Sequence, residues 1–180
     1  MNKLTPPVGP GDHVFGNPDA PVTLVEYGDY ECPYCGRAHP VVEEVLRQMG
    51  PEARFVFRHF PLAEMHPHAV AAAEAADAAG AQGKFWPMHA TLYENQGALE
   101  PEDLLGYAGA LGLDVPRFAR ELATHAHLAK VEADFRSGVR SGVQGTPTFF
   151  INGVRHEAGW DAPTLLAALR AASRMKKRAA

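Results

Sequence analysis

The pattern of apolar and polar residues divides the chain into two β-rich ends and a helical middle. Residues 22–27 are β-branched and largely apolar, and they predict a buried strand. Residues 53–60 predict a second strand of the same kind. Between them, apolar positions recur at helical spacing over residues 36–50, and a Gly-Pro pair ends the helix. This β–α–β order predicts that the two strands are parallel.

The middle of the chain, residues 61–145, shows no strand pattern. Five segments are helical in character: 69–79, 85–93, one that begins at 100–103, one capped by Asp114 with Pro116 near its start, and 127–143. Five helices are too many for a simple crossover between strands. We therefore expect an inserted, all-helical subdomain.

The β pattern returns after residue 145. Residues 148–151 predict a strand, an Asn-Gly pair predicts a tight turn, and residues 154–156 predict a short antiparallel partner. Asp161 is placed to cap a last helix over 162–174. We interpret the basic tail 174–178 as the solvated end of that helix, where cations suit the helix dipole.

Composition narrows the functional class. A chain of 180 residues fits one domain carrying a large insertion. The net charge of -4 argues against a nucleic-acid-binding protein. No apolar run approaches the roughly 18 residues of a membrane span, and the N-terminus lacks the apolar core of a signal peptide. We expect a cytoplasmic protein without a membrane partner; removal of a signal peptide would instead imply a periplasmic or exported one.

The chain has two cysteines, and both lie in the segment Cys32-Pro33-Tyr34-Cys35 between a strand and a helix. Free N–H groups and the positive end of the dipole at a helix N-terminus stabilise a thiolate. We therefore expect Cys32 to be the exposed nucleophile and Cys35 the resolving thiol of a thiol–disulfide exchange that needs no cofactor. Pro33 restricts the turn. Tyr34 lacks the imidazole of a histidine, which should leave Cys32 less acidic than a histidine there would.

Two other interpretations of the cysteine pair stay open. His39 follows Cys35 by one helical turn, so the three residues could begin a zinc site, although a structural site needs four ligands. The pair could also form an inert local disulfide. Because exchange chemistry explains the position of the motif best, we expect no metal.

A second motif, Gly-Thr-Pro-Thr at residues 145–148, stands directly before the later strand. Together with Cys-Pro-Tyr-Cys and the helical insertion, it resembles the DsbA-like thioredoxin-fold thiol–disulfide oxidoreductases, in a short form without a signal peptide. The resemblance extends from about His13 to Leu169. It implies an α/β thioredoxin fold, a central mixed sheet flanked by helices, with these parts: an N-terminal arm 1–12, a thioredoxin-like domain 13–60 and 146–175, and the inserted helical subdomain 61–145.

The resemblance assigns further residues. Glu26 would be a buried acid beneath Cys35 that accepts or supplies its proton, and burial should raise the pKa of Glu26. Pro147 would follow a cis peptide bond, with the backbone of Thr146 opposite the nucleophile and free to pair with an extended substrate. Pro40 would kink the first helix.

Other residues near the motif receive separate predictions. Asp29 and Glu31 precede the nucleophile, and they should raise the pKa of Cys32 if they lie close to it. His66 and His68 are two positions apart and would not share a helical face, so we expect core or surface roles. We expect core packing rather than substrate contact for three residues of the helical middle: Phe85, Trp86 and Met88.

The sequence thus predicts a protein disulfide oxidoreductase. Its partners would be protein or peptide thiols and disulfides, with glutathione or a thioredoxin-type protein for recycling, and the default state is a monomer. We expect a redox potential between roughly -270 mV and -120 mV, the values of thioredoxin and DsbA. The direction, oxidase or reductase, stays open, and a cytosolic location would favour a reductase or general oxidoreductase role. An alternative function is a redox-inert module that holds an extended peptide beside Pro147.

Overall fold

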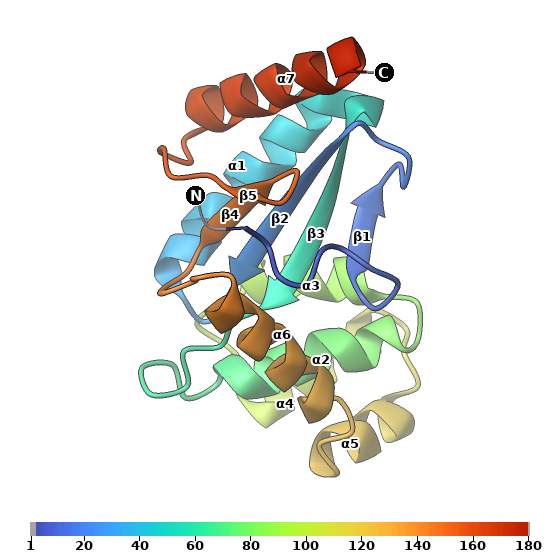
Figure 1. The fold of residues 1–180 in the computed structure, drawn as a ribbon. Coiled ribbons are helices and arrows are strands. Elements are labelled where there is room, and N and C mark those ends of the chain that lie inside the picture. Colours follow the sequence, from blue (N-terminus) through green and yellow to red (C-terminus); the bar gives the residue numbers. More distant parts are fainter. Residues whose placement is uncertain (1–2, 180) are drawn as a thin grey trace.

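A five-stranded mixed sheet forms the centre of the computed structural model, which describes residues 3–179 (Figure 1). The strand order is β1-β3-β2-β4-β5. The central pair β2–β3 is parallel and every other pair is antiparallel, which confirms the predicted β–α–β unit. The strands are β1 His13–Gly16, β2 Val22–Gly28, β3 Ala53–His59, β4 Thr148–Ile151 and β5 Val154–Arg155.

Helices cover the sheet and its lower end. Two helices, α1 (Pro33–Met49) and α7 (Ala162–Ala179), pack against each other beside the sheet, and a short 3-10 turn at Gly50–Glu52 follows α1. Five further helices follow β3 in the chain and gather at the carboxyl ends of β2 and β3 (Figure 1): α2 Ala69–Gly80, α3 Phe85–Glu94, α4 Pro101–Ala110, α5 Val115–Ala123 and α6 Leu128–Arg140. The fold is the predicted thioredoxin fold with helices between β3 and β4.

Alternation along β2 decides which side chains face α1. Val22 and Leu24 belong to the core that contains α1 and α7, whereas Val25 and Tyr27 belong to the core on the other face of the sheet. Because successive side chains in a strand point to opposite faces, Glu26 lies on the α1 face. A carboxyl group is thereby placed within the larger apolar core.

The N-terminal segment crosses the face of the sheet opposite α1 (Figure 1). Leu4 is buried there, and its N–H donates to the carbonyl of Gly153. Arg58 on β3 is also buried, and its guanidinium donates to Asp12 at 2.7 Å and to carbonyls of the same segment. The segment therefore supplies the partners that a buried arginine requires.

Strand β1 was not predicted. It has four residues, pairs only with β3 at the edge of the sheet, and carries the exposed Phe15.

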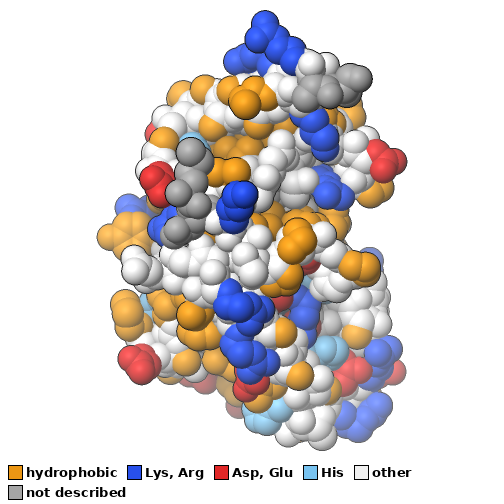
Figure 2. All heavy atoms as spheres, viewed as in Figure 1, with side chains coloured by type: hydrophobic (Ala, Val, Ile, Leu, Met, Phe, Trp, Pro, Cys, Tyr) orange, Lys and Arg blue, Asp and Glu red, His pale blue; other side chains and the backbone are white. Residues whose placement is uncertain are grey.

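The predicted helix caps at Asp114 and Asp161 are confirmed, since each side chain accepts a backbone N–H three residues later. Lysine and arginine side chains gather over the end of α7 (Figure 2). No helix among residues 3–179 is long and apolar enough to cross a membrane.

Candidate active site

The cysteine motif lies at the N-terminus of α1, where the carboxyl end of β2 leads into the helix. Cys32 occupies the N-cap position with extended backbone angles, and Pro33 is the first helical residue. A proline is favourable there because its missing N–H would have no intrahelical acceptor. The backbone N–H groups of Tyr34 and Cys35 remain free to point at the Cys32 sulfur, and both lower its pKa.

The two thiols are free and have opposite acid–base character. A hydrogen bond from the Cys35 thiol outweighs the cost of burial and, with the backbone amides, lowers the pKa of Cys32 to about 5. Burial raises the pKa of Cys35 far above its ordinary value, and the charge of Glu26 adds to the rise. At neutral pH, Cys32 is therefore a thiolate and Cys35 a thiol that donates to it.

The exposure of Cys32 differs from expectation. Cys32 is only 4% exposed and Cys35 is 0% exposed, so the nucleophile is the more accessible sulfur but is itself largely covered. Gln96, two residues beyond the end of α3, donates through Nε2 to the carbonyls of Tyr30 and Cys32, at 2.8 Å each. These bonds fix the loop that leads into the motif, and no local sequence pattern pointed to Gln96.

Glu26 is buried on the α1 face of β2, as its position in the strand requires. Its residue exposure is 2%, and its Oε1 atom finds no hydrogen-bond partner within residues 3–179. Desolvation, reinforced by the charge on Cys32, raises the pKa of Glu26 to about 8. The carboxyl group is thus mostly protonated at pH 7 and can exchange a proton near neutral pH.

Thr146 and Pro147 lie opposite the nucleophile. The peptide bond between them is cis, and the Cys32 Sγ lies 3.6 Å from the carbonyl oxygen of Thr146. Thr146 also lowers the pKa of Cys32. A hollow of about 430 Å³ begins at Pro147 and is lined further out by Arg155, His156 and Trp160.

Asp29 and Glu31, which were expected to raise the pKa of Cys32, are not among the groups that affect it most. Asp29 accepts a hydrogen bond from Leu62 and lies 2.7 Å from Nδ1 of His66. Glu31 lies 2.8 Å from Nδ1 of His68, and the pKa of that histidine is raised by Glu31. Each carboxylate therefore has a histidine partner that offsets its charge.

The two histidines come from the loop between β3 and α2, not from a helix. The i,i+2 spacing of His66 and His68 matches the i,i+2 spacing of their acidic partners. Burial disfavours charge on His66, but the hydrogen bond and charge of Asp29 outweigh it, and the pKa of His66 is raised.

Other candidates lie apart from the thiols. His39 faces Glu43 at 3.6 Å, and within residues 3–179 neither cysteine belongs to a group of three close metal-ligand side chains. Phe85 and Met88 are core residues, as predicted, and Trp86 is half-buried against the same core. Pro40 lies inside α1.

Comparison with known proteins places this geometry in a family. Residues 9–171 match the family model described as Thioredoxin. A thioredoxin-like oxidoreductase of Silicibacter pomeroyi is 31% identical, with a TM-score of 0.78 and coverage of 92% of this chain and 94% of that chain. The alpha-DsbA1 of Wolbachia pipientis shares the fold at 20% identity, with a TM-score of 0.81 and coverage of 96% of both chains.

Curated relatives are similar over nearly the whole chain but are much longer. A protein of Salinispora arenicola named Na(+)/H(+) antiporter NhaA 1 is 51% identical over 170 residues, which cover 94% of this chain and 26% of that protein. The chain spans about a quarter of the length of the curated relatives it matches. From the matched family model, this chain belongs to the thioredoxin family, and its fold is that of the DsbA-like thiol–disulfide oxidoreductases.

Proposed function

We propose that this protein is a thiol–disulfide oxidoreductase in which Cys32 is the nucleophile and Cys35 the resolving thiol. The observation that carries the proposal is the Cys32 thiol at the N-terminus of α1, with a pKa of about 5 beside a Cys35 thiol of much higher pKa. Ionised sulfur is the attacking species in exchange, and a pKa below 7 keeps Cys32 in that form.

The exchange proceeds in two balanced steps. The Cys32 thiolate attacks one sulfur of a substrate disulfide, forms a mixed disulfide and releases the other sulfur as a thiolate. Cys35 then loses its proton and attacks the Cys32 sulfur, which releases the second substrate thiolate and leaves a Cys32–Cys35 disulfide. The substrate is reduced and the protein is oxidised; the reverse sequence oxidises a substrate dithiol.

Glu26 is the proposed proton acceptor for Cys35. Cys35 is 0% exposed, so bulk water cannot remove its proton directly. Glu26 is close enough for its charge to raise the pKa of Cys35, and its own pKa of about 8 lets it both accept and return a proton at neutral pH. Glu26→Gln should therefore slow the resolving step and leave the first attack largely intact.

The proposed substrate site runs past Thr146 and Pro147. An extended peptide could pair with the backbone at Thr146 while its sulfur reaches Cys32, 3.6 Å from that carbonyl. The hollow beside Pro147 offers Arg155, His156 and Trp160 to the flanking residues of the peptide. Protein or peptide thiols and disulfides are thus the proposed partners, and a separate thiol or disulfide pair would reset the protein after each turnover.

The low pKa of Cys32 favours a disulfide-donating direction. At pH 7, a pKa of about 5 stabilises the dithiol form by about 2.7 kcal/mol relative to a cysteine that ionises above pH 7. For a two-electron couple this corresponds to roughly 60 mV. The oxidised pair should therefore pass its disulfide to substrates whose cysteines have ordinary pKa values.

Trapping of the mixed disulfide tests the proposal. Cys35→Ser should accumulate a covalent complex with a disulfide-containing peptide, detectable by mass and reversed by reductant. Cys32→Ser should form no such complex and should lose turnover, because Cys35 is buried. Full turnover by Cys32→Ser would refute the assignment.

The antiporter name belongs to proteins about four times longer, and we assign no transport activity to this chain.

A further inference from the structure

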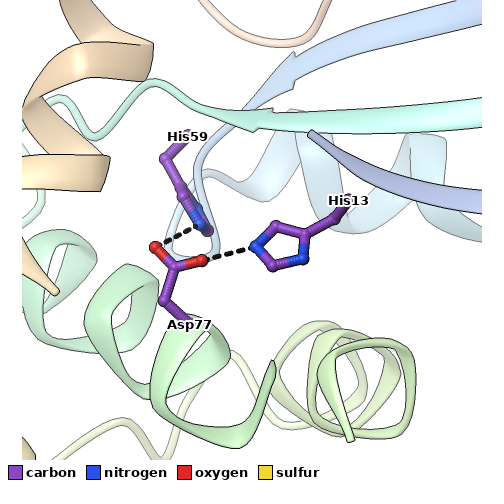
Figure 3. Close-up of side chains that lie close together, drawn as sticks. All are labelled: His13, His59 and Asp77. Atoms are coloured by element: carbon purple, nitrogen blue, oxygen red, sulfur yellow. Dashed lines mark hydrogen bonds and ion pairs between the residues drawn. The ribbon is translucent and has the colours of Figure 1, made fainter. Parts of the chain in front are cut away.

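Three potential metal ligands meet on the side of the sheet where β1, β3 and α2 converge (Figure 3). His13 begins β1, His59 ends β3, and Asp77 projects from α2 between the two imidazoles. The Asp77 Oδ1 atom lies 2.6 Å from His13 Nε2, and Asp77 Oδ2 lies 3.3 Å from His59 Nε2. Their ligand atoms all lie within 4.8 Å of one another.

Two of the three side chains are buried and incompletely paired. His59 is 1% exposed and Asp77 is 5% exposed. His59 Nε2 and Asp77 Oδ2 form a 3.3 Å ion pair with each other but no well-formed hydrogen bond, and His59 Nδ1 has no hydrogen-bond partner within residues 3–179. Buried polar atoms in native proteins are nearly always satisfied, so these atoms call for a further partner.

One of the three separations already has the value expected between two ligands of a single zinc ion. Tetrahedral zinc with ligand bonds of about 2.0–2.1 Å places neighbouring ligand atoms about 3.3 Å apart. The 3.3 Å separation in the ion pair between His59 Nε2 and Asp77 Oδ2 has this value. The His13–Asp77 contact of 2.6 Å is a hydrogen bond whose proton a metal would displace.

We propose that His13, His59 and Asp77 form a zinc-binding site. The donors would be Nε2 of each histidine and a carboxylate oxygen of Asp77, with a water molecule as fourth ligand. Access is through His13, whose side chain is 24% exposed. Two imidazoles favour zinc over magnesium or calcium, which prefer oxygen ligands.

The proposed zinc site is separate from the two thiols, but it lies close to Tyr30, near the cysteine motif. The His13 ring stacks on Phe85 at 3.6 Å, and the His59 ring lies 5.9 Å from the ring of Tyr30. Tyr30 lies two positions before Cys32 and is buried. A bound ion would tie β1, β3 and α2 together behind the active-site loop, with its fourth position open to water or another small ligand.

Metal titration of a cysteine-free protein tests the site without interference from thiolates, which themselves bind zinc. The Cys32→Ser/Cys35→Ser protein, freed of metal by chelator, should bind one Zn²⁺ per chain in calorimetry. Added Zn²⁺ should raise its Tm. Co²⁺ should give the visible bands of a four-coordinate site and no thiolate charge-transfer band.

His13→Gln in that background should weaken Zn²⁺ binding at least about a hundredfold, since loss of an outer-shell partner alone costs 10–100-fold. The matched control is His125→Gln: His125 also pairs with a carboxylate of α2, Glu74, but is 65% exposed and has no third ligand. The control should bind Zn²⁺ like the parent. Absence of one-to-one binding by the parent, or equal affinity of His13→Gln and the parent, would overturn the proposal.

Discussion

Replacement of Glu26 by glutamine should remove a specific pH dependence of stability. The carboxyl group is 2% exposed, and burial with the nearby Cys32 charge raises its pKa from 4.5 to about 8. Between these two values the folded protein binds more protons than the unfolded chain. The stability that this group contributes is fully present below about pH 4.5 and is lost as the pH rises through about 8.

The size of the effect follows from the two pKa values. Each pKa unit corresponds to about 1.4 kcal/mol of differential interaction. The number of protons bound at Glu26 differs between the folded and the unfolded protein. Integrating this difference from about pH 5 to about pH 7.5 gives a loss of about 3 kcal/mol in the free energy of unfolding. Glu26→Gln has nothing to ionise and should lack this component.

The assay is chemical denaturation of the reduced protein at both pH values. Comparison of the pH-dependent change, rather than of absolute stability, cancels the constant cost of burying an amide. The control is Glu64→Gln, at an exposed position in the loop after β3, which should retain the wild-type pH dependence. A Glu26→Gln protein whose stability changes with pH in parallel with the wild type would refute the assignment of a raised pKa to this residue.

Three further predictions address the thiols, a loop contact and packing. Cys35→Ala removes the hydrogen bond that lowers the pKa of Cys32 most, so the pH midpoint of Cys32 alkylation should rise from about 5 by about one to two units. Cys35→Ser keeps a hydrogen-bond donor, so it should keep most of the lowering of the Cys32 pKa. Identical alkylation midpoints for Cys35→Ala and Cys35→Ser would count against the hydrogen bond. His66→Gln should destabilise the protein most at pH values below 6.5, and progressively less as the pH rises through the raised pKa of His66. Urea midpoints across this pH range measure the effect. A loss of stability that does not vary with pH would contradict the charged pair of His66 and Asp29. Gly28→Ala would drive a methyl group into a neighbouring phenylalanine ring and should lower the free energy of unfolding by about 1–3 kcal/mol. Gly106→Ala, in open space on a helix, should raise it by up to about 1 kcal/mol. Equal Tm values for the two variants would contradict the packing argument.

Local patterns in the sequence were sufficient to predict most of the fold. The β–α–β unit, the helical middle and the Asn-Gly hairpin each depend on residues close together in the chain, so periodicity and turn chemistry revealed them. Strand β1 was missed because a four-residue edge strand is defined by its pairing with β3, about forty residues away, rather than by the apolar and polar pattern of its own residues.

The site was predictable where one motif carries the chemistry and unpredictable where distant segments meet. The placement of Cys32 and Cys35 followed from their motif, and the burial of Glu26 was expected from the family resemblance; strand alternation explains it in the structure. The partners of Asp29 lie 33 and 37 positions away, so no local pattern revealed that its charge is offset. The His13–His59–Asp77 cluster likewise joins three separate elements and becomes visible only in the fold.

The most direct test of the central claim is the equilibrium of the Cys32–Cys35 pair with a glutathione redox buffer, read by thiol alkylation. A Cys32 pKa of about 5 lies between the values of about 7 for thioredoxin and about 3.5 for DsbA. Interpolation between their potentials of about -270 mV and -120 mV predicts a two-electron transition at roughly -185 mV. A transition at or below about -270 mV would contradict the proposed thiolate stabilisation, and the absence of any transition would contradict the redox function itself.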